Sequence, residues 1–342
     1  MKRFLLILLS LVLFTSYAAP KKKKSRSRRK SKTESVIKSV NYPCSFDDSK
    51  QRALVWFAKG DKPRPLIVVL HTWSWNFEKA LPYAEPAVKY NFHMIAPDFR
   101  GRNTAGKYLS MGSDAAVEDI VSAVEWMKKR ANVDPDKIYL MGGSGGGHMA
   151  LLMAGRHPDI WAGVSVWCPI TDLKKWCEFH KGKNYGKHII DTLHGDPRTE
   201  GGAAKEAAKR SPVTWLENAR NVNIDIGAGI NDGHTGSVPI DHSLNAFNIL
   251  AGEDDKIPQE HIDLLTLKRK VPAGTPPVKD AGYGKRKVLY RKTSGNCRVT
   301  IFSGAHDILT SYSYKWLAQQ KKGKAAVWKE FKDDGKAQVL TK

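Results

Sequence analysis

A glycine-rich turn between two apolar segments is the sequence feature that most constrains the fold. Residues 137–141 read Lys-Ile-Tyr-Leu-Met, an apolar run with the length of a buried strand. Residues 142–147, Gly-Gly-Ser-Gly-Gly-Gly, follow at once, and a helical segment is expected over 148–156. A strand that passes into a helix through so short a turn is typical of the repeating unit of parallel α/β sheets.

Other segments repeat this alternation of strands and helices. Strands are expected at 53–58, 66–70, 92–96, 163–167, 223–228 and 298–302, and helices at 114–130, 243–250 and 308–319. Short connections between such elements favour parallel pairing with right-handed crossovers. We therefore expect an α/β fold with a mostly parallel central sheet and helices on both faces.

The turn after the strand at 137–141 also has the pattern of a catalytic motif. Gly142, Ser144 and Gly146 fit Gly-x-Ser-x-Gly between a strand and a helix, which is the nucleophile elbow of the α/β-hydrolase fold. Ser144 is the expected nucleophile, and the N–H of Gly145 is expected to face a developing oxyanion. A phosphate-binding turn is the alternative, but no Gly-x-Gly-x-x-Gly or Gly-Lys-Ser/Thr pattern accompanies this one.

A second oxyanion donor is expected in the loop after the strand at 66–70. That loop begins His71-Thr72-Trp73, and we expect the N–H of Trp73 to be the donor. A glycine is usual after the histidine in this fold, and Thr72 departs from that pattern. Trp75, two residues further on, is a candidate substrate-binding residue, although tryptophans also serve as packing residues.

The general base and its acid partner should follow the nucleophile in the order Ser, acid, His. His306 comes after the strand at 298–302 and before a helix, so it is the expected base. Asp232 and Asp254 are the two candidates for the acid. Asp232 is favoured because a strand precedes it, whereas the residues before Asp254 have the pattern of a helix. His148 is expected to have a packing role.

At this point the sequence resembles the prolyl oligopeptidase-like family of α/β-hydrolases, including its dienelactone hydrolase-like and acetylxylan esterase-like members. The resemblance extends over about residues 65–320 and rests on the elbow, Arg210-Ser211-Pro212, the 232–239 segment and Gly304-Ala305-His306. It implies a serine hydrolase that needs no cofactor or metal. The oligopeptidases of the family carry a large β-propeller for which this chain has no room, and that favours an esterase.

The first forty residues suggest export. Residues 1–19 have the basic start, apolar run and small final residues of a signal peptide, so a secreted or periplasmic location is expected. An uncleaved membrane anchor is the alternative, but the apolar run is short for a spanning helix. Residues 20–40 are expected to be a disordered basic tail that could attract anionic polymers, and 41–342 the catalytic domain.

Two segments interrupt the pattern of strands and helices. Residues 171–210 are expected to form a cap over the sheet, with Trp176 and Tyr185 as candidate substrate-binding residues. Residues 269–296 are expected to be a second, irregular insertion. The four cysteines could form two disulfides in an exported protein or remain free, and no metal-ligand cluster is apparent.

The function that these patterns favour is cleavage of carboxylic esters through an acyl-enzyme, with an acylated carbohydrate as a candidate substrate. Specific binding of nucleic acid is not expected, and no membrane-spanning segment is expected after removal of the signal peptide. A serine peptidase of the same family is the first alternative. A non-catalytic binding protein on a hydrolase scaffold is the second.

Overall fold

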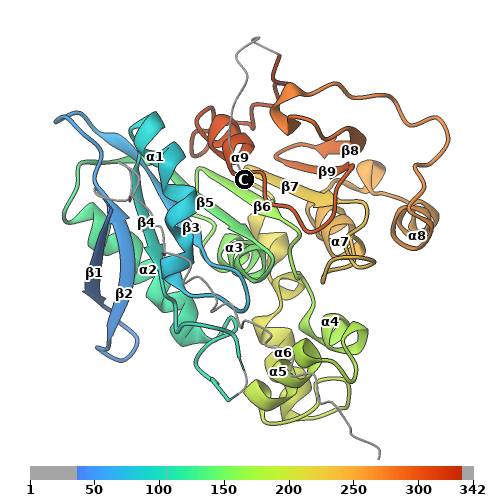
Figure 1. Cartoon of the computed structure of the whole chain (residues 1–342), viewed down its shortest axis with the longest axis horizontal. Coiled ribbons are helices and arrows are strands. Elements are labelled where there is room, and N and C mark those ends of the chain that lie inside the picture. Colours follow the sequence, from blue (N-terminus) through green and yellow to red (C-terminus); the bar gives the residue numbers. More distant parts are fainter. Residues whose placement is uncertain (1–36, 105, 333–342) are drawn as a thin grey trace, which may run out of the picture.

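The computed structural model describes residues 37–332 except Ala105 (Figure 1). The expected signal peptide and most of the expected tail lie outside these residues. Strand β1 (Lys38–Pro43) begins inside the segment 20–40, so the expected boundary of the tail is wrong at its end. Lys38–Pro43 pairs with β2 (Lys50–Trp56), and Tyr42 is buried against the core, which explains why these residues join the domain.

Nine strands of the described residues form one sheet in the order β1-β2-β4-β3-β5-β6-β7-β9-β8. Six consecutive strands in this order, β4, β3, β5, β6, β7 and β9, pair in parallel. Antiparallel pairing is confined to the two ends of the sheet. The mostly parallel α/β sheet is confirmed. The remaining strands are β3 (Arg64–Leu70), β4 (His93–Pro97), β5 (Val133–Gly143), β6 (Gly163–Trp167), β7 (Ile224–Gly229), β8 (Val288–Ser294) and β9 (Cys297–Phe302).

Helices cover both faces of the sheet because the central strands are apolar on both sides. In β3, Leu66, Val68 and Leu70 pack on one face, and Ile67 and Val69 pack on the other. Residues of α2 (Asp114–Lys128), α3 (Gly145–Arg156) and α7 (Asp241–Leu250) share the first core, and residues of α1 (Ala84–Tyr90) and α9 (Thr310–Leu317) share the second.

The expected cap segment contains three helices between β6 and β7: α4 (Leu173–Phe179), α5 (Asn184–Leu193) and α6 (Gly202–Arg210). They gather at the lower right of Figure 1, beyond the end of the sheet. Residues 173–210 are called the cap below. Its apolar residues share a core with Trp73 and Val238, which belong to the loops after β3 and β7. The cap is therefore packed directly on two loops at the carboxyl ends of the strands.

The segment 269–296 is not wholly irregular, which corrects the expectation. It contains β8, whose residues from Val288 to Ser294 pair with β9 as the antiparallel edge strand. Lysines and arginines in the segment obscured the strand, because an edge strand carries solvent-exposed charge that a buried strand does not. The helix α8 (Gln259–Lys268) precedes it.

Within residues 37–332, no helix is both long and apolar enough to cross a membrane.

The Arg210-Ser211-Pro212 motif connects the cap to the rest of the domain. The Ser211 hydroxyl accepts a hydrogen bond from the N–H of Leu173 at the start of α4 (2.9 Å), and Arg210 donates to the carbonyls of Tyr108 and Ser110. The carbonyl of Arg210 accepts from Nε2 of His148 in α3 (2.8 Å). His148 is thus a buried packing residue.

The buried His148 predicts a loss of stability in mild acid. Burial lowers the pKa of His148 to about 4, whereas the unfolded chain has a histidine pKa of about 6.5. The unfolded state therefore binds the proton first as the pH falls below 6.5. Protonation of His148 is therefore expected to lower the free energy of unfolding by about 2 kcal/mol between pH 7 and pH 5.

Urea unfolding at these two pH values measures this loss. His148→Gln keeps an N–H donor without a titratable ring, so its stability should change less with pH than that of the parent. An equal pH dependence in the two proteins would contradict the assignment.

Candidate active site

Ser144 lies at the sharp turn between β5 and α3. It has φ 57° and ψ −122°, a conformation that an L residue adopts only under strain. Its N–H donates to the carbonyl of Trp167 on the neighbouring strand β6 (2.8 Å), and its carbonyl accepts from the N–H of His148 (2.9 Å). These bonds fix the strained turn from both sides, and the Ser144 side chain stands at the first turn of α3.

The two motif glycines on either side of Ser144 are required by close backbone contacts. A Cβ at Gly142 would lie 2.2 Å from the carbonyl oxygen of Gly146. A Cβ at Gly146 would lie 2.4 Å from the carbonyl oxygen of Leu70, at the end of β3. Both distances are far shorter than a van der Waals contact, so any side chain at either position would open the turn.

The two predicted oxyanion donors lie side by side. A Cβ at Gly145 would lie 2.5 Å from the backbone nitrogen of Trp73, which places the start of α3 directly against the loop after β3. Within the described residues, the N–H of Trp73 donates to no protein acceptor. The buried His71 ring lies between the carbonyls of Thr72 (2.9 Å from Nδ1) and Asp98 (3.0 Å from Nε2), and it donates to one of them through its single N–H, which braces the same loop. The geometry suits a pair of N–H groups that face one substrate oxygen.

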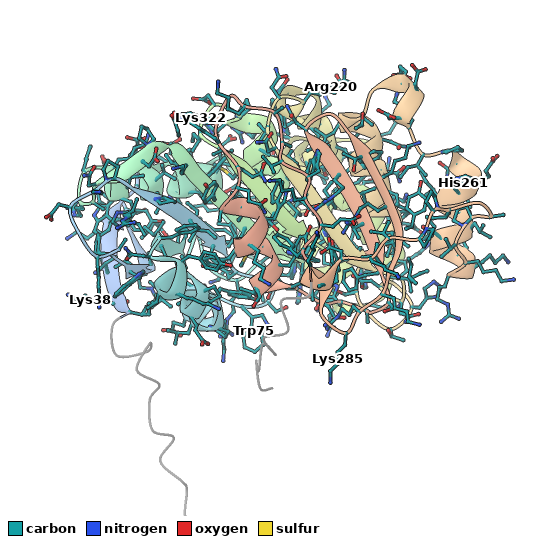
Figure 2. All side chains as sticks on the ribbon, turned by 90° about the horizontal axis from the view of Figure 1, so that it is seen from above. Lys38, Trp75, Arg220, His261, Lys285 and Lys322 are labelled. Atoms are coloured by element: carbon teal, nitrogen blue, oxygen red, sulfur yellow. The ribbon has the colours of Figure 1, made fainter. Side chains whose placement is uncertain are left out.

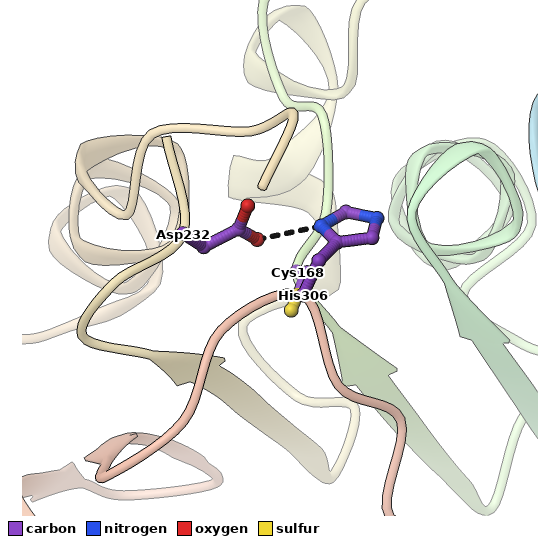
Figure 3. Close-up of side chains that lie close together, drawn as sticks. All are labelled: Cys168, Asp232 and His306. Carbon is purple, nitrogen blue, oxygen red and sulfur yellow. Dashed lines mark hydrogen bonds and ion pairs between the residues drawn. The ribbon is translucent and has the colours of Figure 1, made fainter. Parts of the chain in front are cut away.

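His306 and Asp232 form a hydrogen-bonded pair (Figure 3). Nδ1 of His306 lies 2.7 Å from Oδ2 of Asp232, and the other ring nitrogen points away from the carboxylate. Asp232 is buried, and its Oδ1 accepts from the N–H groups of Gly233 (3.0 Å) and Val238 (3.1 Å). Because these bonds hold the carboxylate, the imidazole has a fixed orientation, as a general base requires.

The structure distinguishes the two candidate acids by position. Asp232 follows β7, whose neighbour β9 leads into the loop that carries His306. Asp254 lies in an exposed 3-10 turn (Glu253–Asp255) after α7, and Nδ1 of His306 is bonded to Asp232 instead. Of the two candidates, only Asp232 is bonded to the expected base.

Cys168 is a further neighbour of this pair. Its thiol contacts the carbonyls on both sides of His306, those of Ala305 (3.9 Å) and Asp307 (3.6 Å). Cys168, Asp232 and His306 have potential metal-ligating atoms within 4.8 Å of one another. Burial, followed by the charge of Asp232, raises the pKa of Cys168 well above its usual value. Nδ1 of His306 and Oδ2 of Asp232 are bonded to each other in this group, which is the arrangement of an acid–base pair.

All four cysteines are buried free thiols. Of the two possibilities that the sequence left open, disulfides or free thiols, the structure therefore has free thiols, and Cys168 and Cys177 are not bonded to each other.

The three candidate substrate-binding residues differ in exposure. Trp75 is 46% exposed, and Figure 2 shows it on the side of the molecule opposite Arg220 and Lys322. Tyr185 in the cap is partly exposed. Trp176, in contrast, is completely buried and packs edge-on against Trp73, with ring centroids 4.7 Å apart. In this structure Trp176 supports the oxyanion loop and presents no surface to a substrate.

Gly236 is a further residue of the site that sequence reasoning did not identify. A Cβ at this position would lie 2.1 Å from Oδ1 of Asp232 and 2.9 Å from Cβ of His306. The cluster of glycine and polar residues after Asp232 was visible in the sequence as a turn signal. Its contact with His306 was not, because the two residues are far apart in the chain.

Comparison with known proteins identifies a family for this chain. The sequence pattern of the prolyl oligopeptidase family matches residues 83–264, which is more than half of the chain. Dipeptidyl aminopeptidase BIII from Pseudoxanthomonas mexicana is 27% identical over 204 residues, which cover 55% of this chain and 28% of that protein. A probable acetylxylan esterase A from Aspergillus clavatus is 26% identical over 141 residues, which cover 36% of this chain and 45% of that protein.

Among solved structures, an acetyl xylan esterase from Paenibacillus sp. R4 superposes with a TM-score of 0.51 at 20% sequence identity. The superposition covers 63% of this chain and 74% of that chain, and it supports the α/β-hydrolase fold. The matches to the two sequence relatives span less than half of the length of either one.

Proposed function

This chain belongs to the prolyl oligopeptidase family of serine hydrolases, and we propose that it cleaves carboxylic esters through an acyl-enzyme formed on Ser144. In this mechanism His306 takes the proton of the Ser144 hydroxyl and later returns a proton to the leaving group. Asp232 orients His306 and stabilises its cation. The N–H groups of Gly145 and Trp73 stabilise the oxyanion of the tetrahedral intermediate.

The strained turn at Ser144 is the observation that carries the proposal. A positive φ at a non-glycine residue costs free energy, and here several backbone contacts maintain it. This cost is explained if the turn serves to place the Ser144 hydroxyl at the N-terminus of α3, beside the loop of Trp73. The 2.7 Å bond between His306 and Asp232 supports the same conclusion from a separate part of the chain.

The proposed substrate is an ester on a carbohydrate. Trp75 offers an exposed aromatic ring two residues after the proposed donor Trp73, and aromatic rings are suitable platforms for sugar rings. The relative named as a probable acetylxylan esterase supports this choice. The dipeptidyl aminopeptidase relative supports a second candidate, a peptidase with the same residues in the same roles.

Two measurements test the proposal. A fluorophosphonate probe should label the purified protein at Ser144, and an unlabelled protein would contradict any serine hydrolase mechanism. Turnover of acetylated xylo-oligosaccharides should then exceed turnover of aminoacyl amides. Faster cleavage of the amides would instead favour the proposal that the protein is a peptidase.

We also propose that the protein acts outside the cytoplasm, which is motivated by the signal-peptide pattern of residues 1–19. Fractionation of the source cells, with N-terminal sequencing of the recovered protein, tests this proposal. A mature chain that still begins at Met1 and remains in the cytoplasm would contradict it.

A further inference from the structure

The cap contacts the proposed catalytic machinery at two separate points, and both contacts involve α4. Nε1 of Trp176 donates to the carbonyl of Ser237 (2.8 Å), and Nε2 of His180 lies 2.8 Å from the same oxygen. A carbonyl only accepts hydrogen bonds, so Nε2 of His180 must carry the ring proton. Two buried donors therefore converge on one backbone acceptor outside the cap.

The acceptor belongs to the segment that holds Asp232. Gly236, before Ser237, leaves no room for a side chain beside Asp232 and His306. Val238, after Ser237, donates its N–H to Oδ1 of Asp232 (3.1 Å). The position of the Ser237 carbonyl thus sets the position of the groups on either side that contact the acid.

The second contact is made by the ring of Trp176. The same side chain that bonds Ser237 packs edge-on against Trp73, at 4.7 Å between ring centroids. Trp73 carries the proposed oxyanion donor. One buried side chain therefore touches both the loop of the acid and the loop of the oxyanion donor, which come from distant parts of the sequence.

The N-terminal end of α4 is held in place by hydrogen bonds. The N–H of Leu173 donates to the Ser211 hydroxyl (2.9 Å), and the Thr171 hydroxyl donates to the carbonyl of His242 in α7 (3.1 Å). A helix fixed in this way is able to hold the Ser237 carbonyl in place.

We propose that Trp176 and His180 are positioning residues for the reaction, through which the cap fixes Asp232 and the Trp73 loop in their productive geometry. The proposal rests on the proposed function of Ser144, His306 and Asp232. It gives Trp176 and His180 a role in the reaction that is separate from any role of the cap in binding substrate. Displacements of about 1 Å in such a site reduce rates by about 100-fold, so modest loosening of the segment has a measurable effect.

Trp176→Phe and His180→Phe test the proposal, because each keeps an aromatic ring and removes the N–H donor. We expect each to lower kcat for an ester about 10-fold, the size expected for a partial loss of this positioning, while KM changes little. The acid limb of the pH profile of kcat/KM should move to lower pH, since a displaced Asp232 stabilises the His306 cation less.

Two further variants separate positioning from general stability. His180→Gln retains an N–H donor and should keep most of the activity and the pH profile of the parent. Cys177→Ser is the matched control in α4, because the Cys177 thiol donates to the carbonyl of Gly186, within the cap, and not to that of Ser237. It should leave both kcat and the pH profile unchanged. If Trp176→Phe fails to fold, the two His180 variants decide the question.

An unchanged kcat and pH profile in His180→Phe and Trp176→Phe would overturn the proposal. So would a loss of activity in His180→Phe that His180→Gln fails to restore. The rate of Ser144 labelling by the fluorophosphonate should fall in both Phe variants, and this readout does not depend on the ester. If the parent protein is labelled but cleaves no ester, the proposed substrate is wrong. The labelling rates of the parent and the two Phe variants then still test whether Trp176 and His180 position the site.

Discussion

Replacement of Ser144 by alanine is expected to lower kcat/KM for p-nitrophenyl acetate by about 10⁴-fold or more. The hydroxyl is the proposed nucleophile, and without it the remaining His306–Asp232 pair and the oxyanion donors retain only the residual catalysis typical of such sites. Folding should be preserved, because the described bonds of residue 144 use its backbone N–H and carbonyl. Steady-state hydrolysis by the purified variant measures the effect.

The control for Ser144→Ala is a measurement of its thermal unfolding beside that of the parent. A fully folded variant that still hydrolyses the ester at the parental rate would disprove the assignment of the nucleophile. A variant that also loses labelling by the fluorophosphonate would support it.

Replacement of Gly236 by alanine is expected to reduce kcat/KM by about 10²- to 10³-fold. The added Cβ would lie 2.1 Å from Oδ1 of Asp232 and 2.9 Å from Cβ of His306. The acid, the base or both must therefore move, and misplacement on this scale removes much of the rate that orientation supplies. Ester kinetics across the pH range measure the loss.

Gly202 offers a matched control for this substitution. It begins α6, and a Cβ there meets no heavy atom within 4 Å, so Gly202→Ala adds the same methyl group without a clash. We expect Gly202→Ala to keep parental activity and stability. Parental activity in folded Gly236→Ala would mean that the acid–base pair tolerates displacement, contrary to the geometry described above.

Local sequence patterns predicted the elements that are buried on both sides or that have a regular period. The strand at 66–70 is apolar throughout, and the turn after 137–141 contains the glycines that the close backbone contacts require. The edge strands β1 and β8 were missed because one side of each is exposed and carries polar residues. Periodicity is weak where only a few side chains enter the core.

In the candidate site, too, local sequence patterns predicted some features and missed others. The order Ser144, Asp232, His306 and the position of each residue after a predicted strand can be read from the chain. The preference for Asp232 over Asp254 also came from the chain, through the strand that precedes it. Each of these inferences depends on residues within a few positions of the one assigned, because a local motif fixes the local backbone.

The sequence alone therefore determined the elbow, the parallel α/β sheet and the candidate catalytic residues. Tertiary structure decided what surrounds them: Cys168 beside His306, Gly236 against His306, and α4 bonded to Ser237. It also showed that Trp176 lies buried under Trp73. These contacts join loops that lie tens to more than a hundred residues apart. Close packing of loops at the carboxyl ends of adjacent strands, rather than any local pattern, brings them together.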